Sequence, residues 1–219
     1  MNSFSFSRSF SCSLGFSLLL AVAAPAAAQD PPALSIRPFV MAAEQSFTAI
    51  DTIDAIFGKT TFPFLGGGVQ VVINDGFFVE VSASRFRQTG QRAYISGGKA
   101  FKLGIPLTAT ITPLEISAGY RFNLSALPRV RPYAAIGYGS YAYQESSDFA
   151  QPGDDVDTKH GGYLVNGGIE VRLHRSVGLA IDAQYTQVKG ILGSGGVSQQ
   201  VGESDLGGIA GRLKLVIGR

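Results

Sequence analysis

The sequence predicts an all-β fold, an up-and-down transmembrane barrel of eight antiparallel strands that follows a cleaved N-terminal signal peptide. Three observations predict it. Segments of about ten residues alternate apolar and polar side chains, short turns alternate with long links, and charges fall almost entirely on one row of each segment. A composition of 45% hydrophobic and 16% charged residues with 28 Gly suits a compact β protein and disfavours a disordered chain.

The N-terminus carries the pattern of an export signal. Arg8 precedes an apolar stretch at residues 14–24, and Ala26-Ala27-Ala28 supplies small residues for cleavage. An uncleaved membrane anchor is the alternative, but the stretch is too short to span a bilayer comfortably. We therefore expect a signal peptide at residues 1–28.

The mature chain, residues 29–219, is expected to be one barrel domain. Its charge falls from +2 to +1 when Arg8 leaves, which gives no support to nucleic-acid binding. The sole cysteine, Cys12, lies in the signal, so no disulfide or cysteine-ligated metal is expected. No later segment is a continuous apolar helix of membrane-spanning length, and only helices and closed barrels satisfy their backbone groups in lipid.

The clearest strand is expected at residues 77–85. Phe77, Val79 and Val81 point to one side of it, while Phe78, Glu80 and Ser82 point to the other. The remaining strands are expected at residues 34–41, 64–73, 106–122, 131–144, 163–173, 177–186 and 208–217.

The connections are of two kinds. Asn74-Asp75-Gly76 is typical of a hairpin turn that needs a positive φ, and residues 123–130 and 174–176 form two more short turns. The long links are expected at residues 43–63, 88–105, 145–160 and 189–204. Short turns on one side and long loops on the other are typical of outer-membrane barrels, and they place both termini in the periplasm.

Two of the long links carry local signals. In the first, Phe47, Ile50, Ile53 and Phe57 recur at helical spacing, which predicts a short helix capped by Thr48. In the second, Gly97-Gly98 predicts a hairpin that extends the flanking strands above the membrane.

The row opposite the apolar one carries four acids and five bases. Because a charge facing lipid costs about 2–4 kcal/mol at the midplane, this row is expected to face the lumen. The interior of an eight-stranded barrel is just wide enough for its own side chains, so these charges are expected to pair and close it. The alternative is that they are solvated on one face of a soluble sheet. The predicted lumen network comprises Arg37, Glu80, Glu115, Arg121, Glu170, Arg172, Asp182, Arg212 and Lys214.

Two surface features are also expected. Aromatic residues near strand ends are candidates for interfacial girdles: Tyr120, Phe122, Tyr133, Tyr138, Tyr141, Tyr143, Tyr163 and Tyr185. Basic residues around the second long link are candidates for contact with lipopolysaccharide phosphates, with ordinary loop solubility as the alternative: Arg85, Arg87, Arg92, Lys99 and Lys102.

Signals for enzyme chemistry are weak. His160 with Ser146 or Ser147 is the only candidate catalytic pair, and its spacing gives no support. Residues 152–157 form an acidic loop without the full ligand spacing of a known calcium loop. We therefore expect no enzymatic activity, no cofactor and no metal.

Several segments together resemble eight-stranded outer-membrane β-barrels, the class of the OmpA transmembrane domain and OmpW-like proteins, and a group described as outer membrane protein beta-barrel domains. The resemblance covers essentially the whole mature chain. The segments that carry it are RPFVM (37–41), FLGGGVQVVI (64–73), GFFVEVSASRF (76–86), LGIPLTATITPLEISAGYRF (103–122), RPYAAIGYG (131–139) and GESDLGGIAGRLKLVIGR (202–219).

This resemblance implies a location in the outer membrane and no defined activity. It implies lipid and lipopolysaccharide as partners, with the barrel assembly machinery during biogenesis, and a monomer is expected. A structural or interaction barrel that uses its extracellular loops is the leading hypothesis. A small pore or transporter for ions or hydrophobic molecules, as in OmpW-like proteins, is the alternative. A soluble lipocalin-like barrel would instead place its apolar row around a ligand.

Overall fold

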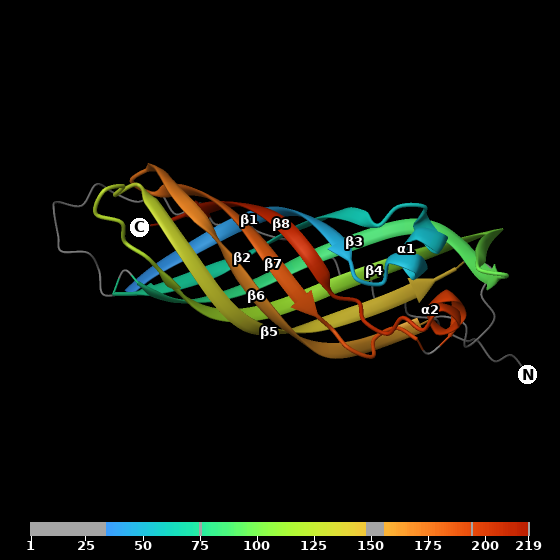
Figure 1. Ribbon diagram of the computed structural model, residues 1–219. Coiled ribbons are helices and arrows are strands. Elements are labelled where there is room, and N and C mark those ends of the chain that lie inside the picture. Colours follow the sequence, from blue (N-terminus) through green and yellow to red (C-terminus); the bar gives the residue numbers. More distant parts are fainter. Residues whose placement is uncertain (1–33, 75, 148–155, 194, 219) are drawn as a thin grey trace, which may run out of the picture. The chain divides into compact units, whose positions relative to one another are not determined.

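The computed structural model describes residues 34–74, 76–147, 156–193 and 195–218. They form one closed antiparallel barrel, in which every strand pairs with its neighbours along the chain and β1 pairs with β8 (Figure 1). The predicted fold class and strand number are confirmed. The predicted signal peptide, residues 1–28, and the acidic loop at residues 152–155 lie outside the described residues.

Each predicted strand is found, and most extend beyond the predicted bounds. The strands are β1 (Leu34–Phe47), β2 (Thr61–Ile73), β3 (Phe77–Ser96), β4 (Lys99–Arg121), β5 (Val130–Ser146), β6 (Val156–His174), β7 (Val177–Gln187) and β8 (Gly208–Ile217).

The longest strands form a hairpin that rises above the membrane. β3 and β4 have 20 and 23 residues, respectively. At about 3.3 Å per residue, even tilted strands of this length exceed the ~25 Å apolar belt of an outer-membrane barrel. Gly97 and Gly98, with φ of 57° and 73°, make the turn at the tip, as the sequence predicts. Asn74 likewise has the predicted positive φ, 49°, in the short β2–β3 turn.

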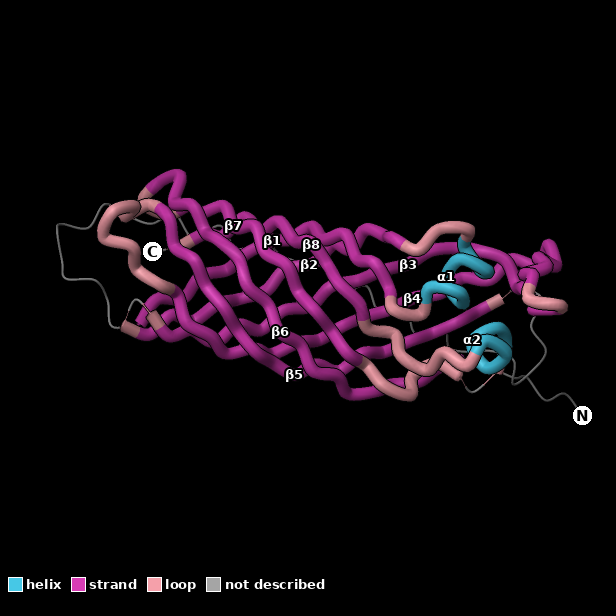
Figure 2. The backbone as a smooth tube through the Cα atoms, viewed as in Figure 1, coloured by secondary structure: helices cyan, strands magenta, loops and turns pink. Residues whose placement is uncertain are grey.

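Two short helices lie at the long-loop end, opposite the C-terminal end (Figure 2). The predicted helix is α1 (Ile50–Phe57), but its expected cap is wrong. The helix follows Ala49 without a side-chain cap, because the Thr48 hydroxyl donates instead to the Gly207 carbonyl oxygen, 3.2 Å away. The second helix, α2 (Gly196–Val201), was not expected. Within the described residues, no helix has the length and apolarity needed to cross a membrane.

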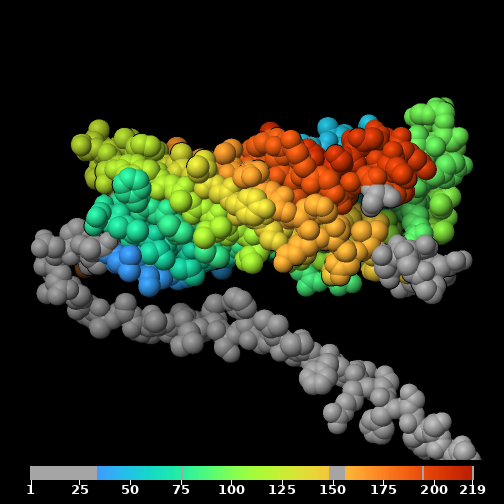
Figure 3. All heavy atoms as spheres, turned by 90° about the horizontal axis from the view of Figure 1, so that it is seen from below, coloured from blue at the N-terminus to red at the C-terminus, as the bar shows by residue number. Residues whose placement is uncertain are grey.

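The link that contains α2 closes over the barrel end. The carboxylate of Glu203 accepts hydrogen bonds from the backbone N–H groups of Asp51, at 3.1 Å, and Thr52, at 2.8 Å, in the first turn of α1. On its other side, the Gln200 side-chain oxygen accepts from the Ile95 N–H of the β3–β4 hairpin, at 2.7 Å. Figure 3 shows this link, in red, at the same end of the barrel as the tip of the hairpin, in green. The first, second and fourth long links therefore form one connected cap.

Candidate functional site

The lumen is the candidate site, because the predicted charges converge there. Eight of the nine are buried inside the barrel, with four acids and four bases among them: Glu80, Glu115, Glu170, Asp182, Arg37, Arg121, Arg212 and Lys214. Alternation along each strand directs them inward, as expected for period-two structure. Arg172 is the exception. It is exposed at the short-turn end of β6 and forms no ion pair within the described residues, so its placement in the buried network was wrong.

At the periplasmic end of the lumen, Glu170 lies between two arginines. One Arg37 guanidinium nitrogen donates to its carboxylate at 3.0 Å, and an Arg121 nitrogen lies 3.0 Å from the same carboxylate. All three side chains are at most 5% exposed. A buried carboxylate shared by two guanidinium groups tolerates its desolvation only because the pairing is this direct.

A second cluster occupies the middle of the lumen. The Lys214 ammonium lies 2.7 Å from the Glu80 carboxylate and 3.3 Å from that of Asp182. Asp182 also pairs with Arg212 and accepts the hydroxyl of Tyr133.

The middle and periplasmic clusters are joined by one amide. The Gln70 side-chain oxygen accepts from Arg37 at 2.9 Å, and its nitrogen donates to Glu80 at 3.3 Å. The Gln70 oxygen thus faces a cation and its nitrogen faces an anion, and the interior charges form one continuous network.

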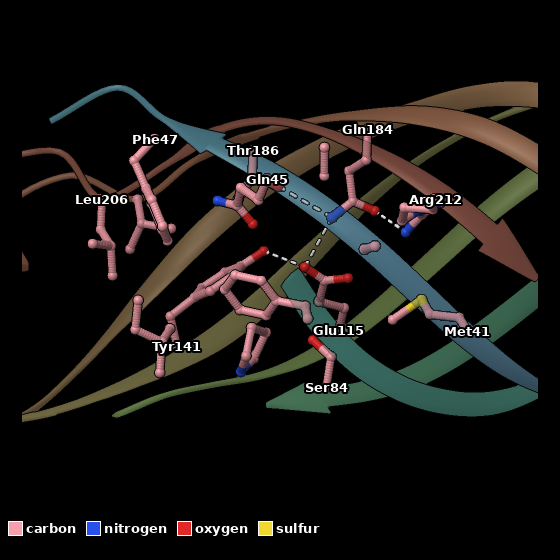
Figure 4. Close-up of a pocket in the computed structure, with 16 residues that line it drawn as sticks. Met41, Gln45, Phe47, Ser84, Glu115, Tyr141, Gln184, Thr186, Leu206 and Arg212 are labelled. Carbon is pink, nitrogen blue, oxygen red and sulfur yellow. Dashed lines mark hydrogen bonds between the residues drawn. The ribbon is translucent and has the colours of Figure 1, made fainter. Parts of the chain in front are cut away.

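The network ends at a small cavity (Figure 4). The Tyr141 hydroxyl and the Gln184 amide nitrogen both point at the Glu115 carboxylate, at 2.7 and 3.0 Å. Gln184 also accepts from Arg212, which connects this group to the middle cluster. The cavity encloses about 30 Å³, room for about two water molecules.

All eight strands contribute residues to this network. Four uncharged members were absent from the predicted set: Gln70, Tyr133, Tyr141 and Gln184. Each lies on the inward row of its strand, so parity was the signal that could have identified them.

Above the cavity the lumen is apolar, which the sequence analysis did not predict. Phe62 and Phe86 are almost fully buried, with ring centroids 5.2 Å apart, and Phe47 and Phe64 pack around them. The plug also includes residues of α1 and of the α2 link. Its buried members are Phe47, Ala49, Ile53, Phe62, Phe64, Phe86, Ala109, Ile111, Tyr141, Tyr143, Val188, Ile191, Leu192 and Leu206.

The outer wall has an apolar belt with aromatic residues near its limits. Tyr120 packs against Phe77 and Phe122 toward the short-turn end, and Tyr138 packs against Tyr163 toward the loop end. Tyr185 is exposed as well. Three predicted girdle residues are wrong, because inward parity on β5 places them in the lumen: Tyr133, Tyr141 and Tyr143.

The predicted lipopolysaccharide-contact residues lie at and above the outer limit of the belt. On β3 the outward row changes from Val81 and Ala83 to the exposed Arg85 and Arg87. Lys99 and Lys102 are exposed near the tip of the hairpin, while Arg92 is half-buried and engaged in an interaction. The five residues therefore share one side of the structure but not one compact site.

The candidate catalytic pair is not assembled. His160 lies opposite Tyr141 on β5, whereas Ser146 is five residues further along that strand, about 16 Å at ~3.3 Å per residue. The Ser147 hydroxyl donates to the Pro106 carbonyl oxygen at 2.6 Å. In the described part of the chain, no group of three or more His, Cys, Asp or Glu residues could hold a metal ion.

A closed barrel with an apolar belt outside and paired charges inside defines an outer-membrane β-barrel. The chain belongs to the family described as outer membrane protein beta-barrel domain, whose model matches residues 14–206. It is therefore a protein of the cell outer membrane, as the sequence predicts. No curated protein sequence matches it.

Three solved structures show the extent of similarity. The N-terminal β-barrel domain of Pseudomonas aeruginosa OprF is 10% identical, with 84% of this chain and 97% of that chain covered and a TM-score of 0.47. Neisserial surface protein A is 16% identical, with 85% and 96% covered and a TM-score of 0.45. Pseudomonas aeruginosa OprG is 12% identical, with 85% and 93% covered and a TM-score of 0.46.

Proposed function

We propose that this chain is a structural or interaction barrel of the outer membrane, with a closed lumen and the extracellular cap as its working surface. The observation that carries the proposal is the double filling of the lumen. A charge-balanced network crosses the membrane zone, and an aromatic plug lies above it. An ion would have to disrupt both layers to pass, and breaking buried pairs costs about 3–5 kcal/mol each.

Conductance across a planar lipid bilayer tests the closed lumen. Insertion is verified first by heat-modifiable gel migration of the same preparation. We expect no stepwise conductance from the wild-type barrel. Regular conductance steps in most insertions would refute the closed lumen and support the alternative, a small pore or transporter.

The proposal assigns the outward basic residues of β3 and its hairpin to lipopolysaccharide. Arg85 and Arg87 support it, since they face outward where the belt ends and where outer-leaflet phosphates lie. We also propose that the barrel assembly machinery is a partner of this chain during biogenesis, and that the barrel is a monomer without catalytic activity.

Retention of lipopolysaccharide through detergent extraction tests this contact. The test variant carries alanine at five positions: Arg85, Arg87, Arg92, Lys99 and Lys102. We expect its retained lipopolysaccharide to fall several-fold, while a Lys159→Ala, Lys189→Ala control on other strands and loops retains the wild-type amount. Equal amounts of retained lipopolysaccharide in the wild type, the variant and the control would exclude lipopolysaccharide as a partner of these residues.

A further inference from the structure

The periplasmic mouth of the barrel is strongly basic. We use this name for the recess at the short-turn end that is lined by Arg37, Arg121, Arg131, Arg172, Arg175 and Glu170. Five guanidinium groups thus surround one carboxylate. The described acids Glu80, Glu115 and Asp182 lie deeper in the lumen and have partners there.

Among the described residues that line the mouth, Glu170 is the one carboxylate, and it is already paired. Glu170 is shared by Arg37 and Arg121 and also attracts Arg131, so its one negative charge faces several guanidinium groups. Arg172 and Arg175 are exposed, and within the described residues neither side chain forms a hydrogen bond or ion pair. Among the described residues, Arg172 and Arg175 therefore leave positive charge at the mouth that faces the periplasm.

Two buried atoms point to a missing acceptor. The Nε atoms of Arg37 and Arg121 are buried without a hydrogen-bond partner, although both side chains are at least nine-tenths buried. Buried guanidinium N–H groups are normally satisfied, and leaving one unpaired costs about 1–3 kcal/mol. Arg121 is also close enough to Arg37, Arg131 and Arg172 to be repelled by each. An anion bound at the mouth would relieve that repulsion.

The recess has a size and chemistry that suit an oxyanion. Its enclosed part is about 10 Å³, room for about one water or one oxygen atom. Gly178 keeps this space free, because a Cβ atom there would lie 2.8 Å from a Glu170 carboxylate oxygen. Planar guanidinium groups match phosphate with paired N–H donors, so one phosphate oxygen can enter while the others face the exposed arginines.

We propose that the periplasmic mouth binds a phosphate group, held chiefly by Arg121, Arg172 and Arg175. Two sources share this chemistry: free inorganic phosphate in the periplasm, and the headgroup of an anionic phospholipid in the inner leaflet. This site shares Arg37, Arg121 and Glu170 with the lumen network, and it lies at the end of the barrel opposite the lipopolysaccharide contact.

Solution NMR of the full-length folded barrel in nanodiscs tests the site in two arms. In the first, phosphatidylcholine nanodiscs are titrated with inorganic phosphate at constant ionic strength. In the second, phosphatidylglycerol replaces part of the phosphatidylcholine. We expect saturable shifts of the Gly178 and Gly218 amide signals in at least one arm. The arm that responds identifies the source.

The test variant is Arg172→Gln, Arg175→Gln, whose exposed positions leave the buried network intact. We expect it to weaken binding about tenfold or more, because it removes two charge-assisted contacts. The matched control, Lys159→Gln, Lys189→Gln, removes the same charge at the other end of the barrel and should bind as the wild type does. Absence of shifts in both arms, or equal weakening in both variants, would overturn the proposal.

Discussion

The membrane-spanning zone of the barrel and the zone above it have opposite polarity. On β3, Glu80 faces the lumen and Val81 faces lipid, whereas a few residues further along Phe86 faces the lumen and Arg87 faces outward. The strand and its pleat continue unchanged between the two pairs, since Phe86 lies opposite Ile111 in regular register. The side of the wall that receives the apolar side chains therefore depends on the solvent outside it.

Each zone is stabilised differently as a result. Above the membrane, water surrounds the wall, and burial of aromatic side chains in the plug contributes as it does in a soluble protein. Within the membrane, hydrocarbon surrounds the wall, so the polar side chains gather inside and must satisfy one another. One closed sheet therefore contains an ordinary apolar core above the membrane and an inverted, polar core within it.

The largest expected effect comes from breaking the inverted core. Asp182→Ala leaves three acids against four bases in the buried network, and we expect the free energy of unfolding in lipid vesicles to fall by about 3–5 kcal/mol. Urea titration followed by gel mobility measures it.

A paired replacement sharpens this prediction. Asp182→Leu with Arg212→Met restores three acids to three bases, so we expect it to cost less than the single change. A single variant within about 1 kcal/mol of the wild type would show that the network does not stabilise the membrane zone.

A smaller effect is expected when lysine is introduced on the outward row of β7, once in the middle of the membrane zone and once at its outer end. Ile181, 63% exposed, faces lipid in the middle of β7, and Ile181→Lys should cost about 2–4 kcal/mol of unfolding free energy. Gln187→Lys, on the same outward row at the outer end of β7, should cost close to nothing. Equal losses from both substitutions would contradict the placement of the membrane boundary.

The smallest effect concerns the cap. Glu203→Ala removes the carboxylate that accepts from the first turn of α1, and we expect a local loss of about 1 kcal/mol. Amide hydrogen exchange of residues 50–57 should then accelerate about fivefold, with no change on β5. In Glu203→Gln, which keeps one acceptor oxygen, the exchange rate of these residues should lie between those of the wild type and Glu203→Ala. Unchanged exchange in α1 would mean that this contact does not hold the cap.

Much of the fold could be predicted from the sequence because strands repeat every two residues. Alternation gave the eight strands and the inward direction of residues such as Glu80 and Arg212, and turn residues such as Asn74 gave the short turns. The reversal of polarity along β3 was not predictable in this way. A row of Phe and Ile alternating with Arg and Thr has the same period on either face, so only closure of the barrel and the position of the membrane define its direction.

The pairing within the lumen also needed the structure. Arg37 and Glu170 are 133 residues apart, and they meet because the stagger of the closed barrel brings β1 and β6 to the same height. Tyr133 and Tyr141 were misplaced for a related reason. Aromatic composition favours a girdle, but the parity of β5 turns these hydroxyls toward Asp182 and Glu115.

The position of Arg212 and Lys214 on the final strand has a consequence for biogenesis. Without β8, the described interior retains Glu80, Glu115, Glu170 and Asp182 against Arg37 and Arg121, an excess of two negative charges. Arrival of β8 supplies both missing cations at the moment when it seals the seam with β1. A nascent sheet of seven strands would be penalised twice in hydrocarbon, by an open edge and by electrostatic imbalance, so we expect insertion and completion to occur together.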